Sequence, residues 1–320
     1  MGIWNGNVKA GVLLVTALMV LLAACQPVVA NNRTSLTPQG TLEVIQNRGT
    51  LVIATEADYP PQSQRVIQEV RSADTRCDTS AYTANQFSGF DTDVAKEVAK
   101  RLGVEACFVT PPWSQLVAGN WADLWDISIG SMVITSDRMK RLYFTQPYTS
   151  GQAVLFVHKD NEEFKEPADL AGKRIGVCVG CAYESYLRGT LVIPGQQIDF
   201  MIDRAVVAGY DTDSTALDAL AKGDGVHLDA VLTDPDSGKA AIDSGMPLKQ
   251  LDGPLYYDFV SAAIDKKGSN SILLARRVSE IIQEMHKDGT LLALSEKYYG
   301  GDFTTPAAEF DIRKLNQLDE

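Results

Sequence analysis

The chain alternates between short runs of consecutive apolar residues and longer stretches in which apolar residues recur every three or four positions. Residues 50–55 (TLVIAT) are apolar and β-branched, which predicts a buried strand. Residues 91–102 (DTDVAKEVAKRL) repeat valine and leucine at helical spacing, with Asp91 as the expected N-cap and Gly103 as the residue that ends the helix. The two patterns therefore predict a strand followed by a helix.

The same alternation continues along the chain and indicates an α/β organisation with mostly parallel sheets. Helices are also expected over 41–48, 214–222, 271–287 and 290–298, and strands over 104–110, 125–132, 151–158, 174–179 and 228–233. Residues 62–88 interrupt the alternation with a long polar excursion that carries Cys77. A loop of this length is expected to be flexible unless it is cross-linked to the rest of the fold, and a disulfide from Cys77 would provide that cross-link.

The N-terminal region has a different pattern. After a lysine, residues 12–22 are apolar, and two alanines then precede Cys25. This order is typical of a secretory signal peptide, and a cysteine directly after it resembles a bacterial lipobox. The apolar run is too short to span a membrane comfortably. We therefore predict a lipoprotein signal peptide at 1–24, a lipidated Cys25 that anchors the protein to the outside of the cell membrane, and a tether at 25–44.

Composition narrows the possible functions. The 320 residues are 45% hydrophobic, which is enough for the cores of two ordinary domains. The formal net charge of −12 argues against nucleic acid as a partner, because phosphates need a basic surface. The acidic residues are spread along the chain, so their simplest effect is solubility.

Four cysteines remain if Cys25 carries lipid, and an even number in an oxidising compartment predicts two disulfides. Of the three possible pairings, proximity favours Cys178–Cys181, which leaves Cys77–Cys107. A C-x-x-C pair is also compatible with a redox site or half of a zinc site. None of the three histidines lies at ligand spacing from a cysteine, so we expect no metal and no cofactor.

Several sequence blocks, taken in order, resemble family 3 extracellular solute-binding proteins, the amino-acid receptors of ABC importers. The blocks are TEADYPP (55–61), GFDTDVAKEVAKRLGV (89–104), SIGSMVITSDRMKRLYFTQPYTSG (128–151), ADLAGKRIGVCVG (168–180), ALDALAKGDGVHLDAVLTD (216–234) and EIIQEMHKDGTLLALSEKYYG (280–300). Each block is short, and it is their common order over residues 45–302 that makes the resemblance specific.

The resemblance implies a periplasmic-binding-protein-like type II fold, in which two α/β lobes are joined by a two-strand hinge and close over a ligand. Lobe one would be 45–149 and 259–302, lobe two 153–253, the hinge 148–152 and 253–258, and the C-terminal tail 303–320. We expect the protein to be a monomer.

The resemblance also implies a site for an amino-acid zwitterion, whose carboxylate suits a guanidinium fork and whose ammonium suits a carboxylate. By position in the blocks, Arg138 would hold the carboxylate and Asp234 the ammonium. The other interpretation of Asp234 is a helix N-cap or turn residue before Pro235. The remaining residues at ligand positions are Glu56, Tyr59, Trp113, Gly130, Ser131, Val133, Cys181 and Ala182.

Some of these positions bear on specificity. Tyr59 and Trp113 would sandwich the ligand side chain, and Glu56 hints at a cationic or amide group there. Val133 stands where the family often has Ser or Thr, so it keeps the backbone N–H and loses a hydroxyl contact. Ala182 likewise replaces a threonine and leaves only backbone contacts with the carboxylate.

These features predict a lipid-anchored substrate-binding protein that captures a polar amino acid and delivers it to an ABC permease in the membrane. A dehydratase-like enzyme on the same fold is a second possibility. However, no nucleophile set, acid–base pair or metal cluster falls on the matching blocks, so we expect no enzyme. A ligand-sensing receptor is a third, and it would need a transmembrane helix after residue 302, which we do not expect.

Overall fold

The computed structural model describes Met1 and residues 40–318. The predicted signal peptide after Met1, Cys25 and most of the tether lie outside the described residues. Within the described part, none of the helices has the length and apolarity that crossing a bilayer requires. Helices and strands alternate as predicted, and the α/β class is confirmed.

The helices and strands have the following bounds. The α-helices are α1 (Thr41–Arg48), α2 (Phe90–Leu102), α3 (Trp113–Ala118), α4 (Ala182–Leu187), α5 (Asp213–Leu220), α6 (Pro235–Asp243), α7 (Ile272–Lys287), α8 (Thr290–Tyr299) and α9 (Thr305–Ala308). The strands are β1 (Thr50–Ala54), β2 (Asp58–Tyr59), β3 (Ser63–Arg65), β4 (Tyr82–Thr83), β5 (Phe87–Ser88), β6 (Glu105–Val109), β7 (Ile127–Ser128), β8 (Leu142–His158), β9 (Arg174–Cys178), β10 (Val206–Tyr210), β11 (Ala230–Thr233), β12 (Leu248–Gln250) and β13 (Tyr256–Asp265). Short 3-10 helices are η1 (Ala84–Gln86), η2 (Arg138–Lys140), η3 (Pro167–Leu170) and η4 (Ile312–Leu315).

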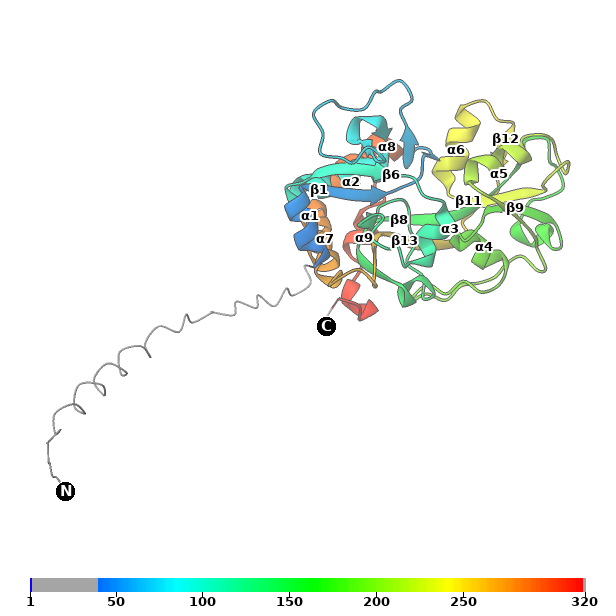
Figure 1. Ribbon diagram of the computed structural model, residues 1–320. Coiled ribbons are helices and arrows are strands. Elements are labelled where there is room, and N and C mark those ends of the chain that lie inside the picture. The colour runs from blue at the N-terminus through cyan, green and yellow to red at the C-terminus, as the bar shows by residue number, and fades with distance from the viewer. Residues whose placement is uncertain (2–39, 319–320) are drawn as a thin grey trace. The chain divides into compact units, whose positions relative to one another are not determined.

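Two long antiparallel strands, β8 and β13, connect two groups of shorter strands. The first strand group is β7-β1-β6-β4 and adjoins β13, while the second is β11-β9-β10 together with β12 and adjoins β8. In Figure 1, α2, α7 and α8 lie around the first group, and α4, α5 and α6 lie around the second. A small separate sheet, β2-β3-β5, follows β1.

The prediction of mostly parallel sheets holds only inside each group. Strand β1 is parallel to β6 and β7, and β9 is parallel to β10 and β11. The connecting strands β8 and β13 pair antiparallel with each other and with their neighbours. A strand in the middle of a mixed sheet can therefore be parallel on one side and antiparallel on the other, which the apolar pattern alone does not reveal.

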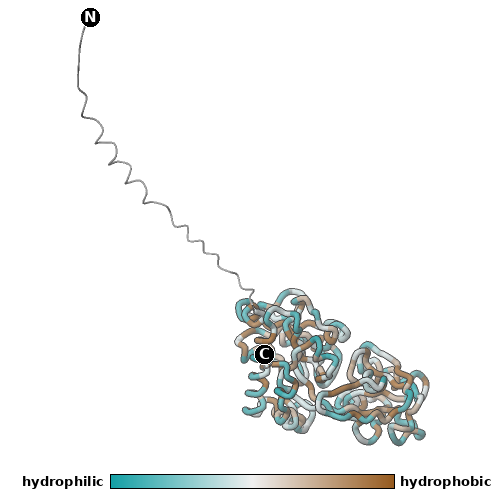
Figure 2. The backbone as a smooth tube through the Cα atoms, turned by 90° about the horizontal axis from the view of Figure 1, so that it is seen from below, coloured by the Kyte–Doolittle hydropathy of each residue, from teal (hydrophilic) through white to brown (hydrophobic). Residues whose placement is uncertain are grey.

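The largest apolar cluster includes residues of both strand groups, and a separate cluster lies in the second group. Val94 and Val98 of α2 are fully buried, as the helical spacing predicts, and Leu217 and Leu220 of α5 are buried in the second group. Hydrophobic segments recur throughout the described backbone (Figure 2). The predicted N-cap is wrong: Gly89 precedes α2, and Asp91 lies buried inside its first turn.

Gly89 is needed because the chain passes very close to another segment at this point. Its φ is +136°, and a Cβ there would lie 2.3 Å from the carbonyl oxygen of Gln62. The segment after residue 302, predicted only as a tail, contains α9 and η4 and buries Ile312 and Leu315 beside Phe144.

Residues 62–88 are fastened to the first strand group. Cys77 forms a disulfide with Cys107 of β6, with the two Cα atoms 5.5 Å apart. The carboxylate of Glu105, at the start of β6, accepts a hydrogen bond from the backbone N–H of Arg76 at 2.8 Å. The structure thus contains the expected disulfide between the polar segment 62–88 and the first strand group.

Replacing both Cys77 and Cys107 with serine should lower the free energy of unfolding by about 2 kcal/mol, because the disulfide restricts the unfolded chain. About 2 kcal/mol is the low end of the range for a native disulfide. Denaturant unfolding measures the change. The matched control replaces Cys178 and Cys181, only three residues apart, and should lose less. Equal stability of the first variant and the wild type would contradict the prediction.

Candidate functional site

Side chains from both strand groups line two adjoining compartments, which share Tyr59, Ser131, Val133 and Tyr183. The space between their lining atoms, open solvent included, is about 310 Å³ in one and about 530 Å³ in the other. We call the smaller one the Arg138 compartment, and its other lining residues are Glu56, Trp113, Arg138, Cys181, Ala182 and Asp213. The larger one is the Asp258 compartment, which includes Thr149, Ser150, Gln152, Asp234, Asp236 and Asp258.

The fold explains why these residues meet. The segments after β1, β6 and β7 carry Tyr59, Trp113 and Arg138, and those after β10 and β11 carry Asp213 and Asp234. All are carboxyl ends of parallel strands, where an open α/β sheet leaves a crevice and presents side chains from successive loops. Residues distant in the sequence are thereby gathered at one site.

Arg138 is a buried cation without a carboxylate partner. It is 5% exposed, and burial lowers its pKa to about 10, which leaves it charged at neutral pH. The guanidinium donates to the carbonyl oxygens of Val133 at 2.9 Å and Gly180 at 3.0 Å, and its Cζ lies 5.3 Å from the ring centroid of Trp113. None of the ion pairs among the described residues includes Arg138. Such a group favours an anionic ligand.

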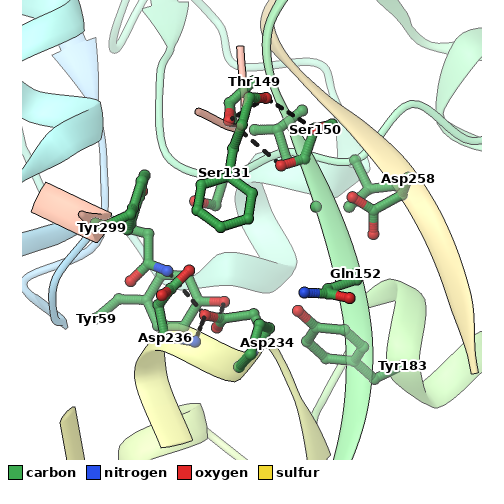
Figure 3. Close-up of a pocket in the computed structure, with 16 residues that line it drawn as sticks. Tyr59, Ser131, Thr149, Ser150, Gln152, Tyr183, Asp234, Asp236, Asp258 and Tyr299 are labelled. Atoms are coloured by element: carbon green, nitrogen blue, oxygen red, sulfur yellow. Dashed lines mark hydrogen bonds between the residues drawn. The ribbon is translucent and has the colours of Figure 1, made fainter. Parts of the chain in front are cut away.

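Asp234 is both a helix N-cap and a residue that lines the cleft. It is the N-cap of α6, where its Oδ1 accepts from the backbone N–H groups of Asp236 at 3.0 Å and Ser237 at 2.9 Å. The same carboxylate accepts a hydrogen bond from the Tyr59 hydroxyl at 2.6 Å and one from the Gln62 side-chain amide at 3.0 Å, and it faces the Asp258 compartment (Figure 3). It therefore caps a helix and links the two strand groups across the site.

Two further buried carboxylates were not predicted. Asp213 is 4% exposed and Asp258 is 3% exposed, and in each the Oδ1 atom has no hydrogen-bond partner among the described residues. Burial, and then the nearby charge of Asp234, raises the pKa of both to about 7. Asp213 was missed because it directly precedes a predicted helix, where an acidic residue is ordinary. Asp258 was predicted only as the end of the second hinge segment, 253–258, and not as a site residue.

These pKa values make stability depend on pH. Between pH 4 and 7 the folded protein retains protons that unfolded aspartates have released, so unliganded Asp258 should cost stability as the pH rises from 5 to 8. Burial lowers the pKa of His286, so its contribution to the free energy of unfolding rises with pH over part of this window. The test therefore compares the Tm of the wild type with the Tm of Asp258→Asn at each pH. We expect the variant to gain several degrees in relative Tm from pH 5 to pH 8; a constant difference would contradict this.

The remaining predicted residues divide between lining and supporting positions. Tyr59 and Trp113 line the site, and so does Glu56, whose pKa is raised by burial and then by Asp213. Gly130 lines neither compartment, and a Cβ added to it would lie 3.2 Å from the Thr55 hydroxyl.

Ser131 lines both compartments, but its polar groups already have partners. Its backbone N–H donates to the Tyr148 hydroxyl at 3.1 Å, and its hydroxyl donates to Asp91 at 2.7 Å. Val133 likewise uses its carbonyl oxygen to hold Arg138. In this structure these two residues therefore shape the wall and orient neighbouring groups.

The loop after β9 forms another part of the wall. Cys178 and Cys181 are joined in a disulfide, Cys181 is the N-cap residue of α4, and Ala182 begins that helix. The Asp213 carboxylate lies close enough to both sulfur atoms for the three to form a possible metal-binding group. Both sulfurs are bonded to each other, however, so the structure contains the predicted disulfide at this position.

Comparison with known proteins identifies the family of this chain. Residues 72–301 match the bacterial extracellular solute-binding proteins, family 3. The chain belongs to this family. The L-cystine-binding protein TcyJ from Escherichia coli (strain K12) is 32% identical over 271 residues, which cover 84% of this chain and 90% of TcyJ.

Solved structures agree with this family and with the type II fold. A crystal structure of an ArgBP mutant from T. maritima has a TM-score of 0.65 and 26% identity, covering 81% of this chain and 99% of that one. The ancestral amino acid-binding protein AncCDT-1, a precursor of cyclohexadienyl dehydratase, has a TM-score of 0.64 and 27% identity, covering 81% and 100%. The relatives named here are binding proteins, and this family 3 protein is accordingly a solute-binding protein rather than an enzyme.

Proposed function

We propose that this solute-binding protein captures an α-amino acid in the cleft and delivers it to the permease of an ABC importer. Arg138 is the observation that carries the proposal, because a buried guanidinium with only carbonyl partners has donors left for a ligand carboxylate. The ligand ammonium would bind Asp234, whose Oδ2 accepts a hydrogen bond from the Tyr59 hydroxyl and from no other group in the described part of the chain. Asp213 offers a second acceptor on the Arg138 side.

Closure around the ligand is part of the proposal. The two strand groups would be the two lobes, with 45–149 and 259–302 in one and 153–253 in the other. The hinge would be 148–152, which lies within β8, and 253–258, which leads into β13. Contacts across the site support this view, since Tyr59 binds Asp234 and Arg138 binds the carbonyl of Gly180. A zwitterion held from both sides would favour the closed arrangement.

The charge of the cleft points to a ligand with additional positive charge. Of the described residues that line the two compartments, Arg138 is the one with a cationic side chain. The lining carboxylates are Glu56, Asp213, Asp234, Asp236 and Asp258. Two named relatives bind ligands with a second cationic group, although in cystine a second carboxylate accompanies it. TcyJ is an L-cystine-binding protein, and ArgBP has been solved in an arginine-bound form. L-Arginine and L-cystine are therefore the first candidates.

A thermal-shift screen of the purified protein against the common amino acids and L-cystine tests the proposal. A ligand that binds only the folded state raises the Tm by mass action. At least one α-amino acid should do so, and the corresponding α-hydroxy acid, which lacks the ammonium, should do so less. Stabilisation by no amino acid would reject the proposed function.

Membrane attachment is proposed to occur through lipid on Cys25. Cys25→Ser should release the protein from the membrane fraction, because the remaining chain would lose its acyl anchor. Fractionation followed by immunoblotting measures the distribution, and Cys25→Ala should behave in the same way. Membrane retention of both variants at the wild-type level would reject the lipid anchor.

A further inference from the structure

The Asp258 compartment is the more acidic half of the cleft. Asp234, Asp236 and Asp258 line it, and its lining includes no lysine, arginine or histidine. Figure 3 shows Asp258 and Gln152 projecting from the two long strands, opposite Asp234 and Asp236 at the start of α6. A neutral or anionic ligand group placed here would face several carboxylates without a cation to compensate them.

Asp258 differs from its acidic neighbours in having a free, buried oxygen. It is 3% exposed, its Oδ1 has no hydrogen-bond partner among the described residues, and it lines the cavity. In the pairing of β13 with β8, Asp258 lies opposite Gly151. A Cβ added to Gly151 would come within 2.5 Å of that Oδ1 atom, so the glycine leaves the space that the carboxylate occupies.

Among the described residues, none is hydrogen-bonded or ion-paired to the Asp258 carboxylate. Arg138 interacts with it electrostatically, but its guanidinium is held by Val133 and Gly180 and lines the other compartment. A buried carboxylate without a hydrogen-bonded partner is costly, and a bound cation recovers that cost. Asp234 is less available, since four hydrogen-bond donors already point at it.

We propose that Asp258 forms a second cation subsite, so that the preferred ligand is a diamino acid that spans both compartments. Its α-carboxylate binds Arg138, its stem passes between Tyr59 and Tyr183, and its second amino or guanidino group reaches Asp258. The aromatic rings shared by the two compartments suit an apolar stem or a cationic group. This inference rests on the proposed function and specifies its substrate class.

Two ligand pairs test the subsite, because each pair differs in the distal cation. L-Arginine is compared with L-citrulline, which replaces the guanidinium with a neutral ureido group. L-Cystine is compared with the mixed disulfide of L-cysteine and 3-mercaptopropionic acid, which lacks the second amino group. Calorimetry on the wild type should show a preference of about tenfold or more for the cationic member of at least one pair, the scale of a hydrogen bond to a charged group.

Asp258→Asn keeps the shape of the side chain and removes its charge. It should weaken binding of the preferred cationic ligand by about tenfold, while changing affinity for the neutral partner by less than about twofold, so that the preference collapses. Asp252→Asn is the matched control, because Asp252 is exposed and lies outside both compartments. It should leave both affinities unchanged.

The outcomes separate the subsite from the function on which it rests. If the wild type binds amino acids but prefers neither cationic ligand, the subsite is rejected and the proposed function stands. An equal loss for both members of a pair in Asp258→Asn would also reject it and assign Asp258 a structural role in the long strands. If no amino acid binds the wild type, both proposals fail. The wild-type comparison keeps the inference testable even if the variant does not fold.

Discussion

Arg138→Ala is expected to weaken amino-acid binding by about 2–5 kcal/mol, which is about one and a half to three and a half decades in Kd. The reason is geometric as well as electrostatic. The guanidinium is buried, pre-positioned by the carbonyl groups of Val133 and Gly180, and free to donate two parallel hydrogen bonds to a carboxylate. Without it, the ligand carboxylate would enter a buried site rich in acidic groups with no compensating charge.

Calorimetry with the best ligand from the screen measures this loss. Arg138→Lys should recover only part of the affinity, because an ammonium keeps the charge and lacks the planar fork. Arg141→Ala is a suitable control: Arg141 is an exposed arginine three residues away, paired with Asp137 at 2.6 Å, and should bind ligand normally. Wild-type affinity in a folded Arg138→Ala protein would mean that the carboxylate binds elsewhere.

The fold was predictable where a local pattern and a local end signal coincide. Helix α2 has apolar residues at helical spacing and Gly103 at its end, where φ is +75°, and its bounds came within one residue of the prediction. Strand β8 was predicted only from residue 151, although it begins at Leu142. Its first half contains Pro147 and several polar residues, whose burial depends on the partner strand β13 and not on any pattern within β8.

The site was predictable only in part, for a related reason. Arg138 and Asp234 were singled out because they lie in recognisable sequence blocks, and in the structure they line the two compartments. Asp213 and Asp258 have ordinary neighbours in the sequence. Both become buried only when the tertiary fold packs distant segments around them. Gly130 illustrates the converse, since it lies in a matching block and yet lines neither compartment. A sequence motif identifies the loop that approaches a ligand, and packing then decides which of its atoms are free.

Asp234 is expected to show two separable effects, because it both caps α6 and lines the cleft. Asp234→Ala should lower the free energy of unfolding by about 1 kcal/mol through loss of the N-cap. It should also weaken ligand binding by about 2–5 kcal/mol through loss of the carboxylate for the ammonium. Asp234→Asn separates the two, since asparagine is an equally good N-cap and removes only the charge.

In Asp234→Asn the amide oxygen would still accept from the backbone of Asp236 and Ser237, and the amide nitrogen would face the Tyr59 hydroxyl, which is able to accept a hydrogen bond. Stability should therefore remain near that of the wild type, while affinity for the amino acid falls by at least about tenfold, the loss expected when a charged acceptor becomes neutral. Denaturant unfolding measures the stability and calorimetry measures the affinity, both on the same preparations. If Asp234→Asn binds as tightly as the wild type, Asp234 serves the protein as a helix cap and as a contact across the site, and another acceptor holds the ammonium, with Asp213 and Glu56 as the carboxylates that line the Arg138 compartment.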